Sequence, residues 1–169
     1  MAELDPPDIH HLRAAEGWLE LGNPKEALLE LDQISATAAS FLEVLGARWA
    51  ICAELKSWPE CIQIAVRILE CAPESPFGWI HRSFALHELR RTTEARDLLL
   101  PAVDKFPQVG TIPYNLACYE CQLGNLDPAR KWLKRAIRLE GRKEIVTRAL
   151  EDTDLKSLHQ ELAALLAGK

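Results

Sequence analysis

The chain has 169 residues, of which 48% are hydrophobic and 27% are charged, a composition typical of a soluble globular domain with a core of its own. Its first residues contain no basic patch followed by an apolar run, and no window approaches about 18 uninterrupted apolar residues, so we expect neither a signal peptide nor a membrane span. The five cysteines are odd in number and lie mostly in helical patterns, which favours free thiols and a cytoplasmic location over a disulfide framework.

Charge is distributed unevenly along the chain, whose net charge is −5. Residues 1–81 hold 5 Lys/Arg and 13 Asp/Glu, whereas residues 82–148 hold 13 Lys/Arg and 8 Asp/Glu. An acidic first half and a basic second half favour electrostatic steering of partners or head-to-tail self-association. The alternative is a drift of surface charge without functional meaning.

A period of 34 residues dominates the sequence. Three columns recur in register over four copies: Gly22, Lys56, Arg90 and Gly124; Ala27, Cys61, Ala95 and Ala129; Ile34, Ile68, Ala102 and Ala136. A helical hairpin of this length cannot bury its own apolar face, so successive copies are expected to stack. The period therefore predicts an all-α repeat protein.

The predicted helices follow in chain order. Asp8 is the expected N-cap of a first helix that ends near Leu21, and Gly22-Asn23-Pro24 begins a second helix over 24–35. The next pair is expected at 39–55 and from Trp58 to before Pro73. The third unit opens after Pro73 and turns at Arg90-Arg91-Thr92, and the fourth ends at Gly141. Beyond the repeats we expect a short helix over 142–151 and a last helix from an Asp154 N-cap through Ala167.

These units resemble tetratricopeptide (TPR) repeats by residue type as well as by period. Small side chains stand where the first helix of a TPR hairpin (helix A) packs on the second (helix B): Ala15 with Ala27, Ser83 with Ala95, and Ala117 with Ala129. Unit two departs from the pattern, because Trp49 faces Cys61 there. We expect that indole to splay the unit or shift its register.

The resemblance implies a right-handed TPR superhelix. Its expected organisation is a tail over 1–7, four units at about 8–41, 42–75, 76–109 and 110–141, and C-terminal capping helices over 142–169. In such a stack the helix A residues line a concave groove. The candidate partner-binding residues are Leu12, Arg13, Glu16, Phe77, Ile80, His81, Phe84, His87, Tyr114, Asn115, Cys118 and Cys121.

An apolar and aromatic groove lining suits an amphipathic helix or an extended apolar segment. The columns that clamp chaperone-tail carboxylates in other TPR proteins hold Leu12, Glu16, Ala47, Phe77 and His81 here, which provide no cationic cradle. The resemblance therefore argues against chaperone-tail binding. As an alternative to an open groove, some of the candidate residues pack against the chain's own terminal helix.

Other chemistries have weaker support in the sequence. His81, His87, Cys118 and Cys121 are zinc ligands by residue type, but two Cys three apart on a regular helix converge poorly, so we expect no metal and no other cofactor. A basic run at 130–143 falls on a convex helix, where a solvated face is normal, so we expect no nucleic-acid binding. Phosphate-loop, Gly-x-Ser-x-Gly and His-Glu-x-x-His motifs are absent, which predicts that the chain is not an enzyme.

The sequence thus predicts a non-enzymatic adaptor or scaffold that binds a protein or peptide in its groove. Two narrower alternatives stay open. Small acidic TPR proteins of this size include secretion-type chaperones that hold an extended substrate segment. The unequal charge of the two halves also fits a self-assembling structural protein.

Overall fold

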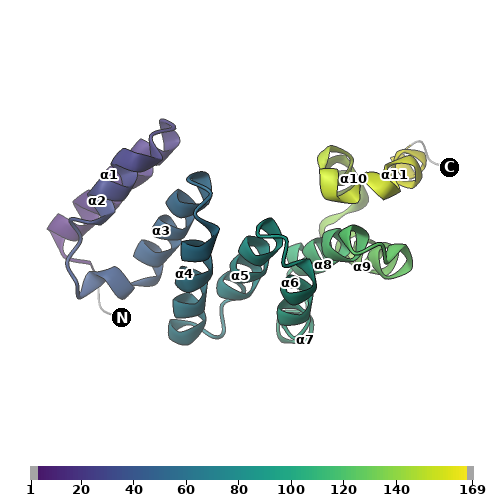
Figure 1. The fold of residues 1–169 in the computed structure, drawn as a ribbon, viewed down its shortest axis with the longest axis horizontal. Helices are drawn as coiled ribbons and strands as arrows, with labels where there is room; N and C mark the ends of the chain where they lie inside the picture. Colours follow the sequence, from purple (N-terminus) through teal and green to yellow (C-terminus); the bar gives the residue numbers. More distant parts are fainter. Residues whose placement is uncertain (1–3, 167–169) are drawn as a thin grey trace. The chain divides into compact units, whose positions relative to one another are not determined.

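The computed structural model describes residues 4–166, and every regular element within that range is helical (Figure 1). The predicted all-α fold is confirmed. Contacts divide the chain into two compact units, Met1–Ala85 and Leu86–Lys169, with the boundary inside one helix. The predicted end of the last helix at Ala167 lies outside the described residues.

The first unit contains two helical hairpins and the greater part of a third helix A. Helix α1 packs on α2, α2 packs on α3, and α3 packs on α4 (Figure 1). Two clusters of buried aliphatic and small side chains form its core, one around Leu12, Leu31 and Ile51 and the other around Leu45, Ile64 and Ile68. The elements are α1 (Pro6–Glu20), α2 (Pro24–Leu31), the 3-10 turn η1 (Ala38–Ser40), α3 (Leu42–Glu54), α4 (Trp58–Cys71) and α5 (Pro76–Glu88), of which the last three residues belong to the second unit.

The second unit pairs α8 with α9 and places the C-terminal elements against them. The helix that follows α5 is broken at Pro101, because proline has no N–H to donate and its ring disfavours a continuous helix. The elements are α6 (Thr92–Leu99), α7 (Ala102–Lys105), α8 (Thr111–Gln122), α9 (Leu126–Glu140), α10 (Arg142–Glu151), the 3-10 helix η2 (Thr153–Leu158) and α11 (His159–Leu166).

The first column of the 34-residue period marks a repeated turn. Its members all have a left-handed backbone, with φ values of 74° at Gly22, 55° at Lys56, 62° at Arg90 and 80° at Gly124. In each turn the N–H of the following residue donates to the carbonyl oxygen five positions back, over 2.8 to 3.0 Å. This is the Schellman arrangement that ends a helix and satisfies its last carbonyls. The sequence period therefore reports a structural period.

Small side chains let the hairpin helices approach, as predicted. Ala15 and Ala27 in the first hairpin, and Ala117 and Ala129 in the α8–α9 hairpin, are all fully buried. The expectation that Trp49 splays its hairpin or shifts its register stays a prediction. The Cys61 thiol lies 3.8 Å from the Trp49 carbonyl oxygen, so α4 approaches the main chain of α3 while the indole turns toward α5.

Two predicted N-caps were wrong. Helix α1 begins at Pro6 after Asp5, and the buried Asp8 instead accepts hydrogen bonds from the Ser35 hydroxyl, at 2.6 Å, and the Ser35 N–H, at 2.8 Å. Asp8 thereby ties the end of the first hairpin to its start. The cap of η2 is Asp152, which accepts from the N–H of Asp154 at 2.9 Å. The Asp8 carboxylate binds donors 27 residues away, and helix-start patterns do not report such a contact.

Candidate functional site

An aromatic cluster on α3, α4 and α5 is the centre of the candidate site in the first unit. The Phe77 ring stacks on the His81 ring with centroids 3.7 Å apart and an interplanar angle of 11°. The Trp49 indole stands nearly perpendicular to the His81 ring at 4.3 Å. Phe84 meets Trp49 edge-on at 6.3 Å and Trp58 at 5.8 Å. Such edge-to-face and stacked pairs favour a fixed arrangement of rings.

The position of α5 depends on a close helix contact. A Cβ atom at Gly78 would lie 2.8 Å from Cγ of Leu69 and 3.0 Å from the carbonyl oxygen of Ala65, so only glycine lets α5 sit this close to α4. Phe77, His81 and Phe84 follow one another at helical spacing on the adjoining face of α5. The helix contact therefore determines where the aromatic rings stand.

His81 contributes a neutral ring to this cluster. Burial lowers the pKa of His81, because the charged imidazolium is desolvated, and the hydrogen bond to the Phe77 carbonyl opposes that shift only in part. Nδ1 donates that bond over 2.9 Å, which assigns the proton to Nδ1. A neutral imidazole stacked on Phe77 and met edge-on by Trp49 adds a flat, weakly polar surface to the cluster.

The cluster reaches solvent at two places. The Phe84 side chain is 37% exposed, which places it among the exposed large hydrophobic residues of the chain. At the Phe77 end lies a cavity of about 220 Å³ whose wall includes the exposed Glu43. It is lined by Leu42, Glu43, Gly46, Ile68, Ser75 and Phe77. This surface is therefore apolar in its middle and acidic at one edge.

The other predicted groove residues of the first unit extend this picture. Leu12 is buried in the core, whereas Arg13 and Glu16 are exposed on α1, and Ile80 is partly buried on α5. Of the twelve candidate residues, the cluster brings together Phe77, His81 and Phe84. Sequence reasoning placed Trp49 opposite Cys61 and included neither Trp49 nor Trp58 in the site.

In the second unit the C-terminal segment covers the corresponding face of α8. The Asp152 carboxylate accepts from the Tyr114 hydroxyl at 2.8 Å and from the Cys118 thiol at 3.5 Å. Asp154 pairs with Nε2 of His87 at 2.9 Å, and its backbone carbonyl accepts from the Gln122 amide at 3.0 Å. We call residues 152–154 the acidic clasp. It binds the candidate residues His87, Tyr114 and Cys118, in line with the alternative that some candidate residues pack against the chain's own C-terminal segment.

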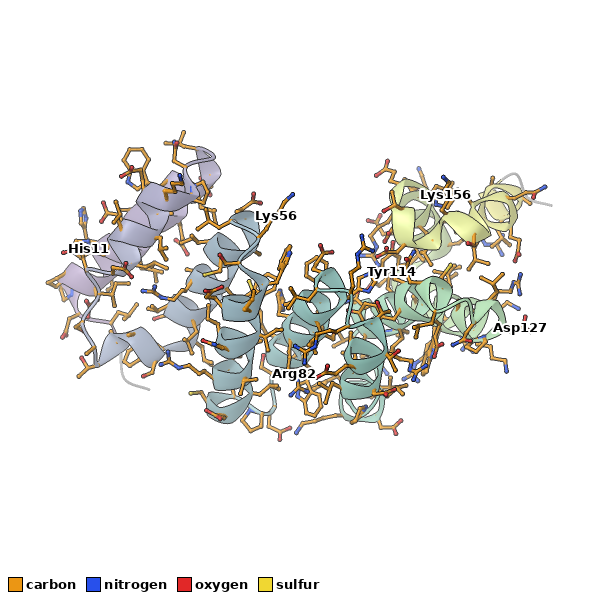
Figure 2. All side chains as sticks on the ribbon, viewed as in Figure 1. His11, Lys56, Arg82, Tyr114, Asp127 and Lys156 are labelled. Carbon is orange, nitrogen blue, oxygen red and sulfur yellow. The ribbon has the colours of Figure 1, made fainter. Side chains whose placement is uncertain are left out.

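Arg148 completes this cover from α10. Its guanidinium lies 3.8 Å from the centre of the Tyr114 ring, close enough for a cation–π contact. Tyr114, which is labelled in Figure 2, therefore lies on the side of α8 that faces the C-terminal helices. Tyr114, Cys118, Cys121 and His87 are all buried, and Asn115 is partly buried.

Burial also determines the protonation states at the clasp. It raises the pKa of the Tyr114 hydroxyl and of the Cys118 thiol, and the neighbouring Asp152 carboxylate adds to both shifts because a second negative charge would repel it. Both groups therefore stay protonated and can donate to Asp152. The thiol is held as a structural donor and is unsuited to act as a nucleophile.

A zinc set does not form from the candidate ligands. Nδ1 of His81 is bound to a carbonyl, and both ring nitrogens of His87 lie within 3.0 Å of oxygen partners, Thr92 and Asp154. Throughout the described range, 4–166, no three His, Cys, Asp or Glu side chains gather in a way that would hold a metal ion. None of the helices in that range is both long and apolar enough to cross a bilayer.

Comparison with solved structures identifies the fold. The chain superposes on residues 41 to the end of MamA from Desulfovibrio magneticus RS-1 with a TM-score of 0.73, at 15% identity over 99% of both chains. It also superposes on TTC0263, a thermophilic TPR protein of Thermus thermophilus, with a TM-score of 0.68, at 18% identity over 95% of this chain and 99% of that one. The chain has a TPR-type fold.

A third neighbour agrees with this identification. MamA MSR-1 gives a TM-score of 0.66 at 20% identity, over 79% of this chain and 76% of the other. No protein-family model and no curated protein matches the sequence. These identities establish a shared fold, and the function of this TPR chain has to be argued from its own residues.

Proposed function

We propose that this protein is a non-enzymatic interaction module that binds a segment of a partner protein through the aromatic face of α3, α4 and α5. The proposal keeps the four predicted TPR units over 8–141 and the cap over 142–169. One observation carries it: Phe84 is 37% exposed although it is fixed between Trp49 and Trp58. An exposed aromatic side chain that becomes buried in a partner's pocket is typical of the few residues that dominate binding energy.

The charge around this face defines the partner further. The stripe Glu43–Ala47–Ala50–Glu54 runs along one face of α3 at helical spacing, with an exposed carboxylate at each end and small, partly buried residues between. Glu16 is exposed on α1, in the same acidic half of the chain. The complementary partner is a segment with an aromatic or aliphatic anchor followed or preceded by Lys or Arg.

The α8 face has a different role in this proposal. Because the acidic clasp already occupies Tyr114, Cys118 and His87, a partner of the wild-type chain binds at the first unit without contacts from these three residues. The candidate contacts in the first unit are Arg13, Glu16, Phe77, Ile80, His81 and Phe84, with Trp49 and Trp58 in support. Leu12 is buried in the core, and Asn115 and Cys121 stay predictions on the α8 face.

Selection from a random dodecapeptide library tests the proposal. We expect enrichment of sequences that combine an aromatic residue with Lys or Arg. For the best selected peptide, calorimetry is expected to show that Phe84→Ala weakens binding by about tenfold or more, the effect of a hot-spot residue. Glu43→Gln is expected to weaken it severalfold, and less so at high salt.

Leu100→Ala is the matched control, because Leu100 is 38% exposed but lies in the second unit. It is expected to leave the affinity unchanged. A library that yields no enriched sequence, or peptides that bind Phe84→Ala as tightly as wild type, would show that this face is not the binding site.

A further inference from the structure

A row of four cations lies along α9 and the start of α10. Lys131, Lys134 and Arg138 are exposed and recur at helical spacing on one side of α9. The exposed Arg142 begins α10 after Gly141 and lines the same cavity as these three. None of the four side chains forms an ion pair or hydrogen bond with a residue in the described range. This basic row is thus a concentrated positive charge without a counterion from residues 4–166.

Neighbouring basic residues behave differently. Arg130 pairs with Asp127 at 2.7 Å and with Glu161 at 2.6 Å, and Arg135 donates to the Val103 carbonyl at 3.2 Å. Arg130 and Arg135 are therefore ion-paired or hydrogen-bonded to other residues of the chain. The contrast sets the basic row apart from an ordinary charged helix face.

An apolar slot runs beside the basic row. A cavity of about 470 Å³ is lined by the four cations together with Ile137 and Leu165. It adjoins a second cavity of about 210 Å³, which shares Lys134, Ile137 and Leu165 and is walled by leucines of α9, η2 and α11. Leu133, Leu158 and Leu162 are almost fully buried in that wall. The slot therefore has an aliphatic floor and a mainly cationic rim, in which the carboxylate of Glu161 is paired with Arg130.

We propose that this slot binds an acidic amphipathic helix of a partner protein, separately from the aromatic face of the first unit. The apolar stripe of such a helix would enter the slot over Ile137 and Leu165, and its Asp or Glu side chains would pair with the basic row. Charge complementarity favours this occupant, because the Asp and Glu side chains of such a helix would face four exposed cations that have no ion-pair partner in the described residues.

A helix fits this surface better than the other polyanions. Single-stranded nucleic acid is held by aromatic stacking platforms, and the residues that line the two cavities include no aromatic side chain. An anionic membrane would meet the exposed cations but leave the recessed leucines unfilled. The chain would then be an adaptor with an acidic-rimmed site in one unit and a basic-rimmed site in the other.

Fluorescence anisotropy with a designed peptide tests the slot. The probe is a labelled helix of about 18 residues with leucines at three- and four-residue spacing and glutamates on both flanks. We expect micromolar binding that weakens with salt. Lys134→Glu/Arg138→Glu is expected to weaken it by about tenfold or more, because two rim pairs are replaced by repulsion. Leu165→Gln, which changes the slot and keeps the charge, is expected to weaken it severalfold.

The control Lys25→Glu/Arg67→Glu changes the net charge equally at exposed positions of the first unit and should leave binding within about twofold of wild type. Equal binding of a scrambled peptide of the same composition would overturn the proposal, because charge alone would then explain the affinity. So would binding of a single-stranded oligonucleotide or of phosphatidylserine vesicles without binding of the helix.

Discussion

The acidic clasp makes a strong prediction about stability. Asp152 accepts from Tyr114, from Cys118 and from the N–H of Asp154, and its removal leaves the buried Tyr114 hydroxyl without this acceptor. A hydrogen bond to a charged group contributes about 1.5–3 kcal/mol, and an unsatisfied buried donor costs about 1–3 kcal/mol. We therefore expect Asp152→Ala to lower the free energy of unfolding by about 3 kcal/mol.

A double-mutant cycle separates the Tyr114–Asp152 bond from the other contacts. Tyr114→Phe removes the hydroxyl alone and is expected to lower the free energy of unfolding by about 1.5 kcal/mol. Combined with Asp152→Ala, the two changes should be less than additive by about 1 kcal/mol or more, because they remove the same bond. Urea unfolding followed by circular dichroism gives all four values.

Thiol labelling reports the clasp independently of global stability. In Asp152→Ala, Cys118 is expected to react with a maleimide under native conditions, whereas in wild type it stays protected by burial and by the raised pKa of its thiol. Asp127→Ala is the control for the unfolding measurements, because Asp127 is an exposed partner of Arg130. We expect it to lower the free energy of unfolding by less than about 1 kcal/mol. The clasp would be refuted if Asp152→Ala lowered the free energy of unfolding by less than about 0.5 kcal/mol, or if the two changes in the cycle were strictly additive.

Three further predictions concern the turns, the first hairpin and the thiols. Lys56→Gly is expected to raise the free energy of unfolding by about 0.5 kcal/mol, because it relieves a left-handed backbone, and Gly22→Ala is expected to lower it by about 1 kcal/mol in the same urea assay. Hydrogen bonds from Ser35 hold the pKa of Asp8 below its ordinary value of 3.8. The ionised Asp8 therefore stabilises the fold above pH 3.8, and this contribution is lost as the pH falls and the carboxylate is protonated. The stability gap between wild type and Asp8→Asn should therefore shrink in acid melts, and a gap independent of pH would contradict it. Ellman's reagent should find one fast thiol, the exposed Cys71, and all five in urea, whereas two or more fast native thiols would count against the burial described here.

The local parts of the fold were predictable because they repeat. The column that contains Gly22 and Lys56 predicted a repeated unit, and the structure has a left-handed residue at each of its positions. The small residues of the hairpins were found in the same way. The repeat columns do not predict the direction of a side chain that departs from its column. Trp49 is the example, because its indole turns toward α5 while its backbone carbonyl contacts the Cys61 thiol.

The candidate site was predictable only in part. The helix A columns located Phe77, His81 and Phe84, which the structure brings into one cluster with Trp49. They gave no sign of the clasp, since Asp152 lies 38 residues from Tyr114 and lies among polar residues typical of a helix start. A non-local contact of this kind leaves no period in the sequence.

The central claim is that a partner segment binds at the aromatic face of the first unit while the clasp keeps the α8 face closed. Amide chemical-shift mapping of the ¹⁵N-labelled full chain with the selected dodecapeptide tests both halves at once. The account predicts perturbed signals at Gly46, Phe77 and Phe84 and unperturbed signals at Tyr114 and Cys118. Perturbations confined to α8, with α3 and α5 unchanged, would contradict it.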